Sequence, residues 1–187
     1  MLFRKVLFFV SILCVSTQSA AGAFVQAGLH LGGDTLATVD FFGSDSQSIE
    51  AGGLISGSVG YESDLSETIL MKLSAGIKFD TITATNADVD FDRYPLNGMI
   101  FYKTKNLHFG AGITQHIGVK LSIDGAFGSD TANFKDATGL VLQMDYLLNE
   151  RGYLSLTFTS IDYELANSNE SIDGSSIGVL IGFRFGK

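Results

Sequence analysis

The segment from Leu107 to Leu121 alternates between two kinds of side chain, and this alternation restricts what the chain can fold into. Successive residues of a β-strand point to opposite faces, so a period of two predicts a strand. One face carries Leu107, Phe109, Ala111, Ile113, Gln115, Ile117, Val119 and Leu121, and the other carries His108, Gly110, Gly112, Thr114, His116, Gly118 and Lys120. The first face is apolar apart from one glutamine, and the second is small and polar. The pattern therefore indicates a strand with lipid on one side and a narrow polar interior on the other.

Residues 1–23 are expected to form a secretory signal peptide. Arg4 and Lys5 precede an apolar run from Val6 to Val15, and Ala21-Gly22-Ala23 follows as a cleavage site made of small residues. The run is shorter than the roughly 20 residues of a membrane-spanning helix. We therefore expect one mature domain, residues 24–187, with a cut after Ala21 as the alternative. The single cysteine, Cys14, lies in the segment to be removed, so no disulfide and no thiolate-bound metal is expected.

The charge of the mature chain excludes one class of partner. Without Arg4 and Lys5, ten basic residues remain against 20 acidic ones, a net charge of −10. This balance argues against nucleic acid as a partner. No stretch of 18 consecutive apolar residues follows the signal peptide, so no transmembrane helix is expected.

The same two-residue alternation recurs along the chain. We expect eight strands, at about residues 24–42, 49–61, 68–82, 94–103, 107–121, 137–147, 153–164 and 174–185. In the seventh, we expect a bulge near Ser160 that brings Ile161 and Tyr163 onto the outer face. The first, third, fifth and seventh connections are long and polar, including residues 83–93 and 122–136, and the others are short. This asymmetry is typical of barrels with long external loops and short periplasmic turns, and an even strand count places both chain ends on the periplasmic side.

Aromatic residues gather near the expected strand ends, as in the interfacial girdles of membrane barrels. We expect a lower girdle and an upper girdle, made respectively of Tyr61, Tyr102, Tyr146, Tyr153 and Phe185 and of Phe41, Phe79, Tyr94 and Tyr163. The alternative explanation is that aromatic residues simply favour strands.

Together the signal peptide, the eight alternating strands, the long and short connections and the aromatic-rich last strand resemble the small bacterial outer-membrane barrels. These include the OmpA transmembrane domain, OmpX and the OmpW group. The resemblance implies an all-β, eight-stranded antiparallel up-and-down transmembrane barrel in the outer membrane of a Gram-negative bacterium. It also implies contact with outer-membrane lipid, lipopolysaccharide and the outer-membrane assembly machinery. One departure is that Gly186 and Lys187 follow Phe185, where these proteins often end on an aromatic residue.

The expected barrel interior carries charges of both signs. The predicted lumen network consists of Asp34, Asp40, Glu50, Lys72, Lys78, Asp80, Lys120, Asp145 and Arg184. Charges in a narrow lumen must be paired, so we interpret the set as an ion-paired plug, with a narrow polar conduit as the alternative. His30, His108 and His116 also point inward and are expected to be hydrogen-bonded side chains rather than metal ligands. No cofactor or metal is expected.

The long connections are acidic. Asp88, Asp90 and Asp92 have the spacing that opens a helical calcium loop, but the glycine and glutamate of the full pattern are replaced by Arg93 and Met99. We therefore reject that motif. The other external acids are Asp124, Asp130, Asp136, Glu164, Glu170 and Asp173. Bridging to lipopolysaccharide phosphates through divalent cations is one hypothesis, and a solvated acidic rim is the simpler interpretation.

These observations predict a monomeric outer-membrane barrel with a structural or surface-interaction role through its acidic loops. The alternatives are passage of a small, apolar solute, a lipid A-modifying enzyme, and a soluble lipocalin-like barrel with its apolar face inside. No catalytic residue is predicted. His116 and Ser122 are the nearest nucleophile–base candidates, and no H-E-x-x-H motif is present.

Overall fold

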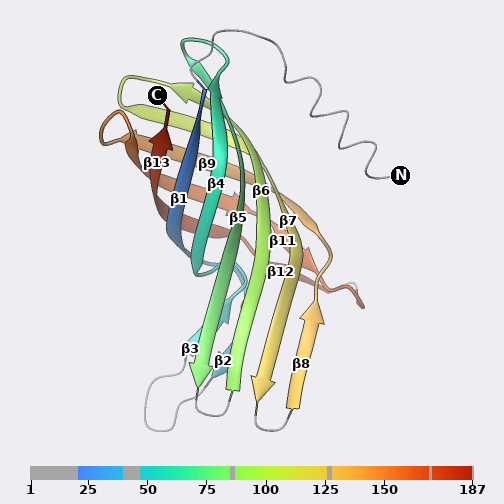
Figure 1. Cartoon of the computed structure of the whole chain (residues 1–187). Coiled ribbons are helices and arrows are strands. Elements are labelled where there is room, and N and C mark those ends of the chain that lie inside the picture. Colours follow the sequence, from blue (N-terminus) through green and yellow to red (C-terminus); the bar gives the residue numbers. More distant parts are fainter. Residues whose placement is uncertain (1–20, 40–46, 85–86, 126–127, 169, 187) are drawn as a thin grey trace.

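The computed structural model describes residues 21–39, 47–84, 87–125, 128–168 and 170–186, and within them it is built from β-strands (Figure 1). Eight antiparallel strands form the barrel, each paired with its neighbours, and the β1–β13 pairing closes the ring. They are β1 (Ala21–Leu31), β4 (Ile55–Asp64), β5 (Ile69–Ala84), β6 (Ala87–Lys103), β7 (Leu107–Gly125), β9 (Ala137–Leu147), β10 (Gly152–Ser160) and β13 (Ser176–Phe185). The predicted eight-stranded up-and-down barrel is confirmed. No helix in the described ranges is long and apolar enough to cross a membrane.

The short strands lie at the end of the barrel where the long connections are. They are β2 (Thr35–Val39), β3 (Gln47–Glu50), β8 (Gly128–Asn133), β11 (Asp162–Glu164) and β12 (Ser171–Asp173). β2 pairs with β3, β11 pairs with β12, and β8 pairs with the far end of β7. At the opposite end the connections are short, and the chain ends there (Figure 1). We call the end with the long connections the outer end.

Two predicted loops are wrong. Residues 83–84, 87–93, 122–125 and 128–133 lie in paired strands, because β5 and β6 remain paired to Ala84 and Ala87, and the far end of β7 pairs with β8. Their many aspartates suggested loops, but the buried Val89, Phe91 and Arg93 alternate with aspartates, which is the period of a strand.

The first predicted strand is also wrong as one continuous element. It breaks at Gly32 and Gly33, whose φ angles of 115° and 87° are outside the range of ordinary strand residues. The second predicted strand is split in the same way, since β3 ends at Glu50 and β4 begins at Ile55.

A bulge at Gly118 reverses the alternation of β7. Tyr94 pairs with Ile117 and Asp92 pairs with Lys120, so Gly118 and Val119 together face Arg93 on β6. Gly118 has a φ of 61°, the left-handed conformation that opens this type of bulge. Beyond it the predicted facing is wrong. Val119 and Leu121 are buried, and Lys120 is exposed rather than in the lumen.

No corresponding bulge occurs at Ser160. Ile161 and Tyr163 continue the inward phase of Tyr153 and are 3% and 0% exposed, so the predicted phase change there is wrong. The interior at that height is apolar, which is why large side chains there point inward.

An exposed apolar belt covers the outside of the barrel. Val59, Ile113, Leu140 and Ile181 are each about 60% exposed. Of the predicted girdles, the exposed members are Tyr61, Tyr94, Tyr102, Tyr146 and Phe185, whereas Phe79 is half-buried. The placement of Tyr153 and Tyr163 in the girdles is wrong, because both are fully buried inside, and Phe41 lies outside the described residues.

β1 begins at Ala21, which pairs with Ser63 on β4. Both predicted cleavage positions therefore fall within the first three residues of this strand, and residues 1–20 lie outside the described residues. The signal peptide stays a prediction.

Candidate functional site: the barrel lumen and the outer end

Four charged side chains form a network in the half of the lumen nearer the short turns. The Lys72 ammonium nitrogen lies 2.6 Å from Asp145 Oδ2 and 3.9 Å from Glu62 Oε2, and Arg184 Nε lies 3.2 Å from Glu62 Oε1. All four side chains are at most 4% exposed. Because two cations face two anions, the layer is electrically balanced. We call these four residues the lower network.

Further polar and aromatic groups hold the lower network in place. Gln143 and Ser155 donate hydrogen bonds to the other oxygen of Asp145, at 2.7 and 2.6 Å. The rings of Phe24, Phe101 and Tyr153 surround the Lys72 ammonium, with centroids 5.3, 4.7 and 4.3 Å away. Such contacts between a cation and ring faces are favourable, most of all away from water.

Glycines on neighbouring strands make room for these rings. A Cβ atom at Gly60, Gly110 or Gly182 would lie 2.5, 2.4 or 2.1 Å from the ring of Phe24, Phe101 or Tyr153, respectively. These three glycines are therefore required by the aromatic rings that fill this part of the lumen.

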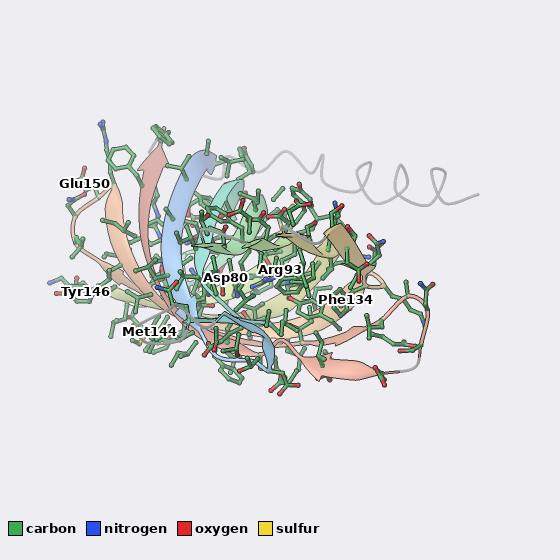
Figure 2. All side chains as sticks on the ribbon, turned by 90° about the horizontal axis from the view of Figure 1, so that it is seen from below. Asp80, Arg93, Phe134, Met144, Tyr146 and Glu150 are labelled. Carbon is green, nitrogen blue, oxygen red and sulfur yellow. The ribbon has the colours of Figure 1, made fainter. Side chains whose placement is uncertain are left out.

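Nearer the outer end, a second group of polar residues lies inside the ring of strands. Lys78 donates to Ser176 Oγ at 2.9 Å, and Arg93 donates to the backbone carbonyl of Gly53. Asp80 accepts a hydrogen bond from the backbone N–H of Glu50 at 3.2 Å. Figure 2, seen from the outer end, shows Asp80 and Arg93 in the interior. We call Lys78, Asp80 and Arg93 the upper group.

The three histidines are each within hydrogen-bonding distance of a neighbour. His30 Nε2 lies 2.7 Å from Ser56 Oγ, His116 Nδ1 lies 2.6 Å from Tyr163 Oη, and His108 Nδ1 lies 3.4 Å from Arg184. Their predicted role as hydrogen-bonded interior side chains agrees with this geometry. Within the described residues, no group of three or more His, Cys, Asp or Glu side chains is arranged to hold a metal ion.

An apolar cluster lies beyond the upper group, toward the outer end. Its buried members are Ile49, Ala51, Ile82, Val89, Phe91, Val119, Leu121, Phe134, Ala137, Ile161 and Tyr163. The Phe91 ring meets those of Phe134 and Tyr163 edge to face, each at 5.8 Å. Burial raises the pKa of Tyr163, which lies beyond the apolar belt, to about 12.

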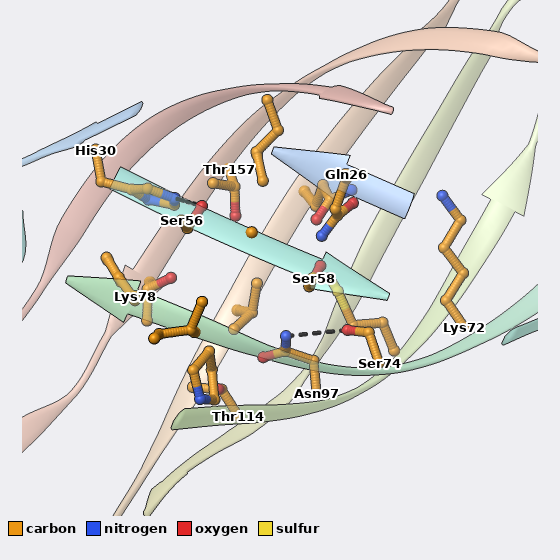
Figure 3. A pocket seen from close by; sticks show the side chains of 18 of the residues that line it. Gln26, His30, Ser56, Ser58, Lys72, Ser74, Lys78, Asn97, Thr114 and Thr157 are labelled. Atoms are coloured by element: carbon orange, nitrogen blue, oxygen red, sulfur yellow. Dashed lines mark hydrogen bonds between the residues drawn. The ribbon is translucent and has the colours of Figure 1, made fainter. Parts of the chain in front are cut away.

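A cavity of about 60 Å³ lies between the lower network and the upper group. Its walls combine Lys72 and Lys78 with hydroxyl, amide and imidazole side chains, among them Ser58, Asn97 and Thr114 (Figure 3). Apolar side chains, such as Met99 and Leu180, form the rest of the wall. Asn97 donates to Ser74 Oγ at 3.1 Å.

The predicted lumen residues separate into two sets. Lys72, Lys78, Asp80, Asp145 and Arg184 lie buried inside the barrel. Asp34 is exposed in the connection after β1, where it accepts a hydrogen bond from the N–H of Asp173, so its predicted place in the lumen is wrong. Lys120 is exposed for the reason given above, Glu50 is half-buried at the rim and Asp40 lies outside the described residues.

Two lumen residues were missed from the sequence. Glu62 was assigned to a turn, although it continues the inward phase of Ser56, Ser58 and Gly60 on β4, and that phase was the signal for it. Arg93 was assigned to a loop and is fully buried. His116 and Ser122 are not brought together, because the Gly118 bulge places His116 inside and Ser122 on the opposite face.

The outer end is strongly acidic. Its described residues include two accessible lysines, Lys120 and Lys135, and the latter pairs with Glu164. Against these stand twelve carboxylates, namely Asp34, Glu50, Asp88, Asp90, Asp92, Asp124, Asp130, Asp136, Asp162, Glu164, Glu170 and Asp173. Hydrogen bonds from Ser175 keep the pKa of Asp173 below its usual range.

The ends of β5, β6, β7 and β8 project from the barrel as one sheet (Figure 1). Its inner side covers the apolar cluster. Its outer side, which we call the acidic face, consists of Thr81, Thr83, Asp88, Asp90, Asp92, Lys120, Ser122, Asp124, Ser129, Thr131 and Asn133. Asp88 is directly opposite Asp124 on the neighbouring strand. Like charges in that relation destabilise a sheet.

Comparison with protein families and with curated protein sequences finds no match. No protein-family model matches the chain, and no curated protein sequence matches it.

Solved structures do share its fold. Neisserial surface protein A is 9% identical with a TM-score of 0.57, and the match covers 89% of this chain and 98% of that one. Ail, the attachment invasion locus protein of Yersinia pestis, is 9% identical with a TM-score of 0.56, over 90% of this chain and all of that one. The N-terminal β-barrel domain of Pseudomonas aeruginosa OprF is 13% identical with a TM-score of 0.52, and the match covers 90% of this chain and all of that one.

The outer surface agrees with this comparison. A closed barrel leaves no unpaired strand edge in the hydrocarbon, and the exposed belt of the protein is apolar with tyrosines at its borders. The fold and the belt together identify the chain as a membrane-spanning β-barrel of the bacterial outer-membrane type.

Proposed function

We propose that this protein is a non-conducting outer-membrane barrel that presents the acidic face to a cationic partner outside the cell. The observation that carries the proposal is the opposition of Asp88 and Asp124 on an exposed sheet. Two facing carboxylates weaken the sheet that holds them. A bound cationic group between them would remove the repulsion.

The composition of the acidic face supports a polypeptide partner. Apart from its aspartates and Lys120, its side chains are short hydroxyl and amide groups, so the surface offers hydrogen bonds rather than apolar anchors. Charge complementarity of this kind speeds association and selects partners by sign. A lysine- and arginine-rich segment of a surface protein or peptide fits this chemistry.

A polyanionic ligand fits it poorly. Ail has been crystallised with the heparin analogue sucrose octasulfate. The described residues of the outer end include twelve carboxylates against two accessible lysines, so we expect this end to repel such a ligand.

The contents of the lumen argue against the solute-conducting alternative. A path through the barrel would have to cross the lower network, the aromatic rings around Lys72 and then the apolar cluster. Conduction requires an ion to be able both to enter and to leave each site along the path. Closely paired charges and packed apolar side chains allow neither the entry nor the exit of an ion.

The test is binding of a lysine-rich peptide to the barrel in lipid nanodiscs. Asp88→Asn with Asp124→Asn should weaken binding by about tenfold, since each lost charge contact is worth on the order of 0.5–1 kcal/mol. The matched control, Asp162→Asn with Glu170→Gln, removes two carboxylates from the separate region around the β11–β12 hairpin and should have a smaller effect. Equal loss in both variants would show a diffuse charge effect and contradict a site on the acidic face.

A further inference from the structure

The upper half of the lumen contains more cationic than anionic groups. In the lower network, Lys72 and Arg184 are balanced by Glu62 and Asp145. In the upper group, Lys78 and Arg93 share one buried carboxylate, Asp80. Among the described residues, no carboxylate oxygen lies within 4.0 Å of the Lys78 or Arg93 side-chain nitrogens.

Lys78 is the least compensated of these groups. It is 4% exposed, and its one hydrogen bond to a described residue goes to Ser176 Oγ. An ammonium group has three donors. A buried cation without a counter-charge is costly. An anion held beside the Lys78 ammonium would offset that cost.

The cavity beside Lys78 is lined with groups that bind anions. No carboxylate is among its wall residues. The hydroxyls of Ser58 and Thr114, both in the wall, have no hydrogen-bond partner in the described structure, and Thr114 is 1% exposed. A hydroxyl can turn its proton toward an anion. Figure 3 shows Lys78, Ser58 and Thr114 around this space, with Lys72 at its other end.

The size of the cavity limits the anion. One water molecule needs roughly 10–15 Å³ of such space, and the cavity offers about 60 Å³. That is enough for one ion of halide size with a few water molecules. A metal cation is disfavoured by the two lysines and by the absence of carboxylates in the wall.

We propose that the lumen cavity holds a small monovalent anion of halide size, bound by the Lys78 ammonium and the Ser58 and Thr114 hydroxyls. The lower network and the apolar cluster lie on either side of it. The anion would therefore be enclosed as the barrel folds, and would act as a structural counter-ion. This proposal is independent of any partner at the acidic face.

The direct test uses bromide, which can be located by its anomalous scattering. The urea-unfolded chain is refolded into detergent in sodium bromide or in sodium gluconate at the same ionic strength, and both preparations are crystallised. We expect a bromide peak in the cavity, in contact with the Lys78 ammonium, in the first preparation alone. A cavity filled with water in the bromide crystal, with peaks restricted to the surface, would overturn the proposal.

A second readout is the urea midpoint of unfolding. A ligand that binds the folded state alone stabilises it in proportion to the logarithm of its concentration once the site is nearly filled. We expect the midpoint of the wild type to rise with bromide relative to gluconate, and the rise to disappear in Lys78→Met. The control Lys120→Met removes a lysine from the exposed acidic face and should keep the rise. An equal response of all three proteins would contradict the proposal. If Lys78→Met does not fold, the bromide crystals of the wild type still test the proposal.

Discussion

Lys72 and Asp145 meet inside the barrel at 2.6 Å, although 73 residues separate them in the chain and their strands, β5 and β9, are not neighbours. Their contact joins two walls of the barrel through its interior. Strand pairing fixes each wall separately, whereas this pair, together with Glu62 and Arg184, ties the walls to one another.

Removing one member of this pair should destabilise the barrel strongly. Lys72→Met leaves Asp145 buried without its main counter-charge, and breaking such a buried pair costs about 3–5 kcal/mol. The measurement is urea unfolding in lipid vesicles. Lys103→Met provides the control, because its partner Asp64 is partly exposed and such a pair is worth about 1 kcal/mol or less. Similar losses in the two variants would contradict the structural importance of the lower network.

The close approach of Gly182 to Tyr153 leads to a second prediction. An alanine Cβ at Gly182 would lie 2.1 Å from the Tyr153 ring, so Gly182→Ala must displace that ring and should cost about 1–3 kcal/mol. Gly57 is a matched control, since no atom lies within 4 Å of a Cβ at that position. Gly57→Ala should leave the unfolding free energy nearly unchanged or slightly higher. If Gly182→Ala leaves the unfolding curve unchanged, the lumen is less densely filled than described.

Tyr163 should lose its proton at a higher pH than an exposed tyrosine. Burial raises its pKa from the ordinary value of 10 to about 12. The folded state therefore holds this proton more tightly than the unfolded state, and the associated stability is complete below pH 10 and is lost as pH rises through 12. The absorbance change on phenolate formation follows this directly. The difference between wild type and Tyr163→Phe should show one group ionising near pH 12, and a difference centred at pH 10 would contradict burial of this ring.

The strand order and most of the facing followed from the sequence, because lipid outside and a narrow lumen inside impose a strict alternation. β9 was predicted with its observed bounds, and β13 with the correct faces. The outer end was harder to predict. There the sheet no longer contacts lipid, and its apolar side chains turn inward to the cluster around Phe91 while aspartates face out. The two-residue alternation thus continues, but here the polar side chains face outward and the apolar ones face inward. In the sequence, such an aspartate-rich strand resembles a polar loop.

Part of the candidate site could also be predicted from the strict alternation of side chains. Lys72 and Asp145 lie in regular strands where the phase is unambiguous. Lys120 was misplaced because one glycine, Gly118, adopts a left-handed conformation and reverses the phase after it. Nothing in the local sequence distinguishes Gly118 from Gly110 or Gly112, which are ordinary strand residues. The pairing of each lysine with its carboxylate depends on strands that are distant in sequence. It is therefore fixed only when the barrel closes.

We propose that the barrel is closed to solutes, and planar-bilayer conductance measures this property in the folded protein. The protein is first shown to be folded by its change in gel mobility on heating, and is then inserted into the bilayer. We expect no stable open state for the wild type, because the lower network and the apolar cluster would both obstruct the lumen. Steady stepwise conductance that is changed by Lys72→Met or by substitution of Phe91 would show a path through the lumen and contradict the account.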